Sequence, residues 1–331
     1  MPAQPFVSVV TPVYNGARFL VECVESVLAQ SHGNLEYVIL DNASTDETAA
    51  ILERYRLQDP RIRVFRNDET LWVIDNWNSA LERISPDSRY CKILHADDTM
   101  QPDCIERLVA VGERHPSVGV LGSPRMRGDI IECEGLPRGQ ECFDGRDIAA
   151  RFLRQEVFAL APSSAMFRSD LVRARRPFYP SEFLHADLAV TFDLLGACDF
   201  GFVHEVLSFS RTHSDSITAT VAEKRRTLFA EWVPMLRRYG PALLPDSELE
   251  AVEAAFLKRY YRLIVRGFLT RREPGFMDYH LDALRKLGRL PGVADILLAL
   301  AAEAGASVAN PGKAFGQMAQ GFNRRPRRPL A

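Results

Sequence analysis

Segments with strand-like and helix-like patterns alternate along residues 1–121, and this alternation limits the fold more than any other feature of the chain. The first run, Phe6–Thr11, is dense in β-branched residues and predicts a buried strand that Pro12 ends. Apolar residues then recur at helical spacing across Arg18–Gln30. The same alternation continues with strands predicted at 35–40, 62–65, 90–94 and 118–121, and helices predicted after Ser44, over 71–84 and over 104–114. This pattern predicts an α/β fold with an open, mostly parallel sheet covered by helices on both faces.

Polar residues follow three of the predicted strands at the point where each strand ends. They are Thr11–Asn15, Asp41 with Asn42, and the tetrapeptide His95–Asp98. Because ligands bind beyond the carboxyl ends of the strands in such sheets, these groups are expected to converge. Neither a Gly-rich dinucleotide fingerprint nor a P-loop follows the first strand, which argues against a dehydrogenase and a P-loop NTPase.

The tetrapeptide carries two adjacent carboxylates, Asp97 and Asp98, at the end of a buried strand. Such a pair is costly unless a cation neutralises it, and an all-oxygen site favours Mg²⁺ or Mn²⁺ shared with substrate phosphates. Taken alone, an Asp-Asp pair is more often a turn or a helix cap. The metal–diphosphate interpretation therefore depends on the rest of the chain.

Charge is distributed unevenly, although the formal net charge is only −2. Residues 222–331 contain 19 Lys and Arg against 11 Asp and Glu, whereas residues 1–221 contain 22 against 32. The acidic front part suits a metal-binding role. The basic back part ends in Arg324, Arg325, Arg327 and Arg328, which fits attraction to an anionic lipid or nucleic acid surface, or simply a solvated terminus.

The six cysteines lack any CxxC spacing, which argues against a zinc site or a disulfide scaffold and for a reducing cytoplasm. Met1–Pro5 runs straight into the first strand, so no secretory signal is expected there. The longest apolar run, near 293–302, is interrupted by Asp295 and is far shorter than the ~20 residues that a membrane span needs. We therefore expect a cytoplasmic protein that is soluble or lies peripherally at the inner face of the cytoplasmic membrane.

Two regions differ from the alternating pattern. Residues 122–160 are polar and rich in Gly and Pro, and predict irregular loops or an edge hairpin. From Ala222 onwards the chain predicts long helices at 224–239, 247–270, 277–287 and 293–304. The expected organisation is thus a first domain over 1–221, with a nucleotide half at 1–121 and an acceptor half at 122–221, and an α-helical appendage over 222–331.

Six stretches taken together resemble the family 2 inverting glycosyltransferases, which have the GT-A fold. The first three are VSVVTPVYNGARFLVECVESVLAQ, YVILDNASTDET and YCKILHADD, and the later ones are PSSAMFR, HADLAVTFDLLG and SRTHSDSIT. They cover roughly residues 5–220 in the order and spacing of the family. The resemblance implies a GT-A-type, Rossmann-like sheet and transfer of a sugar from a nucleotide-diphosphate sugar, most often a UDP-sugar. The C-terminal helices carry no comparable resemblance.

The resemblance also implies roles for individual residues. The nucleotide is expected to contact Thr11, Pro12, Tyr14, Asn15, Asp41, Asn76 and Asp97, with Asp46 as a companion or a helix cap. Asp98 and His213 are expected to ligate a divalent metal, Mn²⁺ or Mg²⁺. Arg211 is expected to bind the diphosphate, with Ser216 and Thr218 as further donors. His95 stands where the family often has Asp, and Trp77 is expected to be a core residue.

Asp187 is the expected catalytic base. It lies at the start of a later predicted helix, where the family usually has a Glu-Asp pair, but here the pair reads Ala186-Asp187, with His185 as a neighbour. A single displacement at the anomeric carbon inverts the configuration and needs one such base. One base candidate with a separate metal pair fits transfer better than a two-carboxylate retaining hydrolase.

The expected partners are a nucleotide-sugar donor and a saccharide or lipid-linked acceptor, within bacterial polysaccharide or glycan biosynthesis. Nucleic acid is not expected, while peripheral membrane contact through the basic C-terminal region and an oligomer are both compatible with the sequence. Two alternatives stay open. A non-catalytic, glycosyltransferase-like scaffold fits the missing Glu before Asp187. A sugar nucleotidyltransferase fits less well, because TPVYNGARF has one Gly and only a distal Arg18.

Overall fold

The computed structural model describes residues 4–157, 160–270, 272 and 275–309. Contacts divide the chain into two units, Met1–Ala219 and Thr220–Ala331. The first unit holds every strand of the described chain, and the second holds the C-terminal helices.

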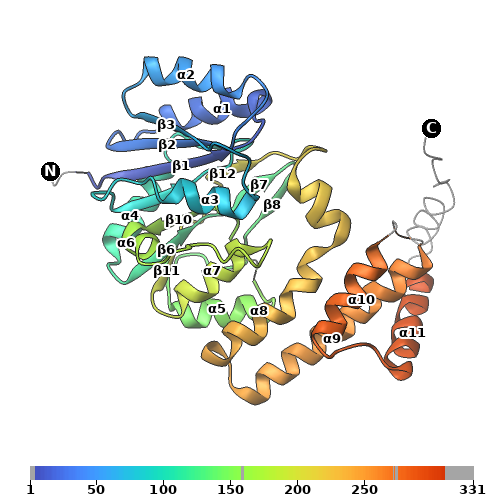
Figure 1. Cartoon of the computed structure of the whole chain (residues 1–331). Coiled ribbons are helices and arrows are strands. Elements are labelled where there is room, and N and C mark those ends of the chain that lie inside the picture. The colour runs from blue at the N-terminus through green and yellow to red at the C-terminus, as the bar shows by residue number, and fades with distance from the viewer. Residues whose placement is uncertain (1–3, 158–159, 271, 273–274, 310–331) are drawn as a thin grey trace, which may run out of the picture. The chain divides into compact units, whose positions relative to one another are not determined.

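Eight strands form the main sheet of the first unit, in the order β3-β2-β1-β4-β10-β6-β11-β9 (Figure 1). Their bounds are β1 Val7–Val13, β2 Leu35–Asp41, β3 Ile62–Arg66, β4 Tyr90–Ile93, β6 Val118–Gly122, β9 Cys142–Phe143, β10 Ala165–Arg168 and β11 Asp199–Phe202. The pairs β1–β2, β2–β3, β1–β4 and β6–β11 are parallel, whereas β10 and β9 run antiparallel to their neighbours. The predicted open, mostly parallel sheet is confirmed.

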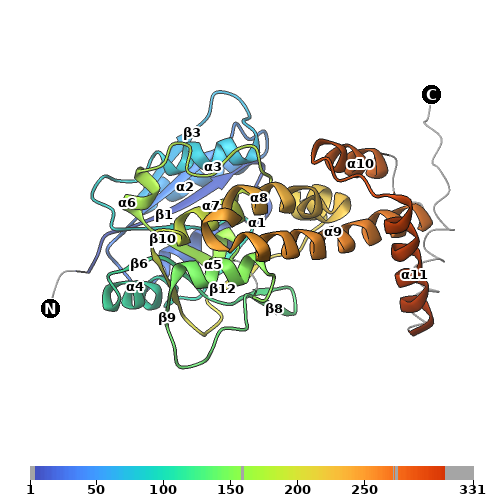
Figure 2. The ribbon, with the colours of Figure 1, turned by 90° about the horizontal axis from the view of Figure 1, so that it is seen from below.

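Helices cover both faces of this sheet (Figure 2). One face buries side chains of β1 and β2 against α1, α2 and α4, because alternate strand residues such as Val7, Val9 and Tyr37 point to the same side. The helix α3 packs on β1 and β2 from the other side, and α7 and α5 pack on β6 and β11. The bounds are α1 Ala17–Leu28, α2 Thr48–Gln58, α3 Val73–Leu81, α4 Cys104–Arg114, α5 Gly145–Leu153, α6 Ser169–Arg173 and α7 Ala186–Leu195.

A small second sheet lies at the carboxyl end of β4. Its strands follow the order β5-β12-β7-β8, with bounds β5 Thr99–Met100, β7 Arg125–Arg127, β8 Ile130–Glu132 and β12 Ser208–Ser210. The strands β7 and β8 form the edge hairpin expected in 122–160. Pairing of β12 with β5 brings the Arg211–His213 segment next to the residues that follow β4.

Two local predictions were wrong. Pro12 does not end β1, since the strand runs on to Val13 in register with Asp41. The pairing of β4 with β1 reaches only Val10, so the missing N–H of Pro12 costs no bond on that side. The second error is α5, inside the region expected to be loops or a hairpin. Asp144 caps this helix by accepting from the N–H of Asp147 (2.8 Å).

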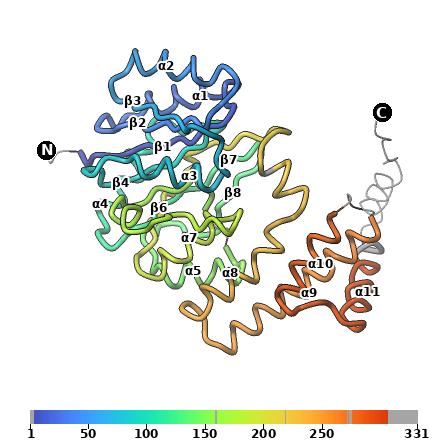
Figure 3. Tube along the Cα trace, viewed as in Figure 1, coloured from blue at the N-terminus to red at the C-terminus, as the bar shows by residue number. Residues whose placement is uncertain are grey.

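The second unit consists of helices whose chain path is clearest in Figure 3. The bounds are η2 Thr218–Glu223, which crosses the boundary between the units, α8 Thr227–Leu243, α9 Asp246–Leu269, α10 Phe276–Lys286 and α11 Val293–Ala309. The helix α9 packs against α8, α10 and α11 around buried Trp232, Phe256 and Tyr260. Across the described residues, no helix is both long and apolar enough to cross a bilayer.

Candidate active site

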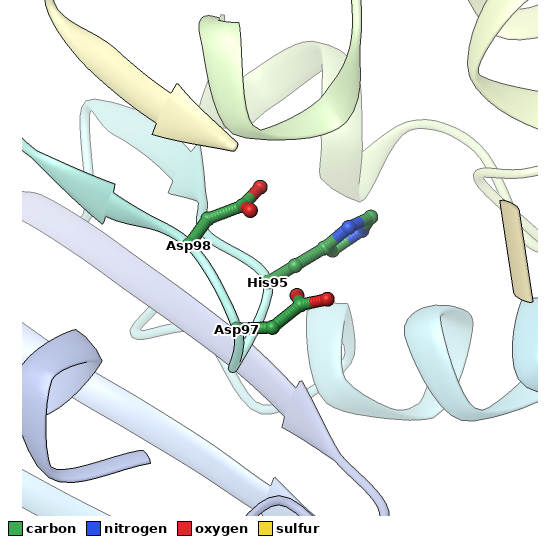
Figure 4. Close-up of side chains that lie close together, drawn as sticks. All are labelled: His95, Asp97 and Asp98. Carbon is green, nitrogen blue, oxygen red and sulfur yellow. The ribbon is translucent and has the colours of Figure 1, made fainter. Parts of the chain in front are cut away.

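The centre of the site is a cluster of His95, Asp97 and Asp98 in the turn that follows β4 (Figure 4). Each residue offers one ligand atom, and these atoms lie within 4.8 Å of one another. The cluster forms because β4 ends at Ile93, and the backbone N–H of Asp98 then bonds back to the carbonyl of His95 (3.0 Å). A short turn after a central strand thus turns one imidazole and two carboxylates toward the same space.

Asp98 is the buried member of the cluster and is held by the end of β12. Its Oδ2 accepts from the Ser210 hydroxyl, and its Oδ1 accepts from the backbone N–H of Arg211, both at 3.0 Å. Burial, together with the neighbouring Asp97 carboxylate, raises the pKa of Asp98. Both oxygens of Asp98 therefore already serve to fasten the cluster to the second sheet.

Asp97 is partly exposed and faces a second imidazole. Its Oδ2 lies 3.0 Å from Nε2 of His213. Two further ring nitrogens, Nε2 of His95 and Nδ1 of His213, are buried without a hydrogen-bond partner. A buried orphan nitrogen costs free energy unless a ligand satisfies it. The residues present thus fit a divalent cation, with the Asp97 carboxylate and the unpartnered imidazole nitrogen of His95 as donors beside Asp98.

A fully buried lysine, Lys92, is linked to this cluster through hydrogen bonds. Nζ of Lys92 on β4 donates to the carbonyls of Ser163 (2.5 Å), Ala165 (3.2 Å) and Ile93 (3.3 Å). The Ser163 hydroxyl in turn accepts from the backbone N–H of His95 (3.2 Å). Burial lowers the pKa of Lys92. The lysine therefore fixes the short 3₁₀ turn η1 (Pro162–Ser164) against the start of the cluster.

The ends of β1 and β2 form a second, closely bonded group. Asp41 is buried, accepts from the N–H of Ser44 (2.9 Å), and pairs with Arg66 of β3. Asn15 accepts from the N–H of Thr45 (2.8 Å), while Asp46 accepts from the N–H of Ala17 (3.0 Å). Burial disfavours the charge of Asp46, but hydrogen bonds from Thr48 and Ala17 outweigh that effect and lower its pKa. These contacts tie the two loops together.

The other residues that are expected to contact the nucleotide differ in burial and in hydrogen bonding. Thr11 is fully buried and donates to the carbonyl of Leu94 (2.8 Å), and Pro12 is buried beside it. Asn76 accepts from Asn67 (3.1 Å) at the start of α3. Tyr14 is 51% exposed, so its ring is the one of this set that is open to a ligand.

Arg211, the expected diphosphate residue, is turned toward α1. Its guanidinium pairs with Glu22 (2.5 Å), donates to the carbonyl of Asp97 (3.2 Å), and lies over the ring of Phe19 (4.7 Å to the centroid). Ser216 donates to the carbonyl of His213 (3.2 Å), and the side chain of Thr218 lies outside the described residues.

Asp187 lies in the first turn of α7 and is partly buried. Burial raises its pKa, and the charges of His185, His95 and Arg125 oppose that shift. Trp77 was expected in the core, but it is only partly buried, and its ring lies 4.7 Å from that of His95.

Sequence reasoning did not single out Lys92, Ser163 or Arg66, and it left His95 without a role. Lys92 is a lysine within an otherwise apolar strand, which is a signal that a search for interrupted strands would have found. Ser163 lies in the quoted PSSAMFR stretch. Arg66 carries no local signal, because only the register of β3 beside β2 brings it to Asp41.

Residues 8–176 match the model of "Glycosyl transferase family 2", so the chain belongs to that family. The fold also matches solved structures. It aligns with S. aureus TarS 1–349 in complex with UDP-GlcNAc at a TM-score of 0.63 and 16% identity, over 85% of this chain and 79% of that one. It also aligns with the mannosyltransferase PcManGT from Pyrobaculum calidifontis, in complex with GDP-Man and Mn²⁺, at a TM-score of 0.58 and 18% identity. This alignment covers 97% of this chain and 85% of that one. The expected GT-A-type fold is confirmed.

Curated relatives match over shorter stretches. Glycosyltransferase GlyG of Streptococcus pneumoniae is 31% identical over 117 residues, which are 35% of this chain and 38% of GlyG. The succinoglycan biosynthesis protein ExoO of Rhizobium meliloti is 28% identical over 167 residues, 50% of this chain and 44% of ExoO. The matched part is thus less than half the length of these relatives.

Proposed function

We propose that this chain is an inverting glycosyltransferase that moves a sugar from a nucleoside-diphosphate sugar, with UDP as the nucleotide, to an acceptor hydroxyl. The observation that carries the proposal is the cluster of His95, Asp97 and Asp98, with Asp187 as a separate candidate base in the first turn of α7. A diphosphate leaving group and an acceptor hydroxyl need these two kinds of group side by side.

The divalent cation supplies electrostatic stabilisation of the charge that develops on the departing diphosphate. Asp97, His213 and His95 are the residues proposed to hold it. The sequence-based assignment gave the metal to Asp98 and the ribose to Asp97, and it stays a prediction. The hydrogen bonds to both oxygens of Asp98 favour Asp97 as the principal carboxylate ligand.

Asp187 is proposed to take the proton of the acceptor hydroxyl. A carboxylate with a raised pKa is a stronger base than a solvated one, which suits proton abstraction near neutral pH. The Glu that usually precedes this residue is absent, and burial is the main cause of the raised pKa of Asp187.

At the nucleotide end, Tyr14 is proposed to flank the base and Asp41 to accept from it. Arg66 and Ser44 hold the Asp41 carboxylate in place. Thr11, Pro12 and Asn15 are proposed to shape this pocket through the loop backbone, since their side chains are buried or bonded to neighbouring loops. When the diphosphate binds, Arg211 would leave its ion pair with Glu22 and pair with the diphosphate, which carries more negative charge than a carboxylate.

For the biological setting, we propose bacterial polysaccharide or glycan synthesis on the cytoplasmic side of the membrane. The names of relatives support it, among them succinoglycan biosynthesis for ExoO and chondroitin synthase for an Escherichia coli protein that is 35% identical over 102 residues. A saccharide or lipid-linked acceptor follows from this setting.

The test is release of nucleoside diphosphate from a panel of UDP- and GDP-sugars with Mn²⁺ or Mg²⁺. We expect turnover with a UDP-sugar and an inverted product, and loss of turnover in Asp187→Asn. Asp193→Asn is the matched control, because Asp193 lies in the same helix but pairs with Arg175 at the surface (2.7 Å). Retained activity in Asp187→Asn would exclude Asp187 as the base. Binding of UDP without turnover of any donor would favour the scaffold alternative.

A further inference from the structure

The outer side of α11 is an unusually apolar surface. Seven of the thirteen large apolar side chains that are exposed in the described chain lie between residues 268 and 300. On α11 itself they include Val293 at 79%, Leu297 at 61% and Leu298 at 68% exposed. Phe268 and Leu269, at the end of α9, are 73% and 56% exposed.

No charged residue interrupts the exposed positions of α11 between residues 293 and 305. They are Val293, Ala294, Leu297, Leu298, Leu300, Ala301, Ala302, Ala304 and Gly305. The two acids of the helix are engaged elsewhere: Asp295 accepts from the N–H of Gly292 (2.9 Å), and Glu303 pairs with Arg262 (3.0 Å) and Arg266 (2.8 Å) of α9. A helix that is apolar on its outer side as well as its packed side is normally covered.

The sequence that follows α11 indicates what covers it. Residues 310–331 lie outside the described residues, and they contain five basic residues and no acidic one. A basic segment that directly follows an apolar helix face matches an anionic lipid surface, where apolar side chains enter the headgroup boundary and basic ones meet the phosphates.

We propose that the outer face of α11 docks this protein on an anionic lipid bilayer, with Leu297 and Leu298 entering the interface and residues 310–331 supplying the charge attraction. The face lies along a helix that packs on α9 through Ala299 and Glu303, so it is available without unfolding the unit. Because a single weak anchor gives only marginal binding, both the apolar face and the basic segment are needed. The proposal does not depend on the proposed transfer activity.

The test is co-sedimentation of the full chain with vesicles of phosphatidylcholine alone or mixed with phosphatidylglycerol, at low and high salt. We expect binding to the mixed vesicles only, weakened by salt. Leu297→Gln/Leu298→Gln should lower the vesicle affinity at least about tenfold. Leu57→Gln is the matched control, since Leu57 is 72% exposed on α2 of the first unit and should leave binding unchanged.

A second variant separates the two contributions. Replacement of Arg324, Arg325, Arg327 and Arg328 by Gln should abolish the preference for phosphatidylglycerol. Two vesicle results would overturn the proposal: no binding of the unmodified chain to mixed vesicles, or unchanged binding of the double Leu variant. A third would be light scattering that shows a dimer for the unmodified chain and a monomer for the double Leu variant. The last result would identify a second copy of the chain as the partner of α11.

Discussion

Replacing Lys92 by Met tests how the buried lysine supports the candidate metal site. Met keeps the length of the side chain but removes its charge and its three donors. The carbonyls of Ser163, Ala165 and Ile93 then lose the bonds of 2.5, 3.2 and 3.3 Å that the ammonium makes. Since the Ser163 hydroxyl holds the backbone of His95, we expect the donor cluster to lose its fixed position.

Two opposing effects set the expected change in stability. Each buried carbonyl left without a donor costs about 1–3 kcal/mol. Removing a buried charge returns several kcal/mol of desolvation free energy. We therefore expect the free energy of unfolding to fall by only about 1–3 kcal/mol. Metal affinity should fall more clearly, by about tenfold, because groups that orient metal ligands are worth about 10–100-fold in affinity.

Mn²⁺ titration of the protein followed by electron paramagnetic resonance measures the affinity, and calorimetry measures the unfolding. The matched control is Leu108→Ala, which empties a fully buried position on α4 and should destabilise by about 2–5 kcal/mol without changing Mn²⁺ affinity. If Lys92→Met binds Mn²⁺ as the unmodified chain does, the lysine only stabilises the fold. A loss of affinity in Leu108→Ala as well would show that general loosening explains the effect.

Three further predictions concern single groups. Asp97→Ala should abolish Mn²⁺ binding in the same resonance titration, whereas the loss in Asp98→Ala should be accompanied by a lower melting temperature because Asp98 is buried and bonded to β12. The acid limb of kcat/KM should lie above the ordinary pKa of Asp, since Asp187 must be ionised to act and burial raises its pKa; a limb at the ordinary value would contradict the assignment. Burial lowers the pKa of His280 from 6.5 to about 4. As the pH falls from 6.5 to about 4, His280 is therefore protonated in the unfolded chain before it is protonated in the folded one. Stability should fall by about 3 kcal/mol as pH drops through that window, and thermal unfolding of His280→Gln should lack this loss.

Much of the fold follows from local patterns. Most strands and helices of residues 6–121 were predictable from local patterns, and α4 was predicted with its observed bounds of Cys104–Arg114. The two-residue strand β5 was not predicted. The helix α5, which begins at Gly145, was missed because residues 122–160 are polar and rich in Gly and Pro. The structure explains the glycine, since a Cβ there would lie 1.8 Å from the carbonyl oxygen of Cys198. That close approach is a tertiary constraint that the local sequence does not reveal.

The candidate site, like the fold, has features that the local sequence predicts and features that only tertiary contacts determine. The sequence alone determined which chemistry follows β4, because His95, Asp97 and Asp98 lie within one stretch of four residues. Only the tertiary structure decided how these groups are used. Pairing of β12 with β5 carries Ser210 and His213 to the two carboxylates, and antiparallel pairing of β10 with β4 places Ser163 over Lys92. Partners 71–116 residues apart leave no local pattern, so their hydrogen bonds, and the burial that shifts the pKa of Asp98, exist only in the folded chain.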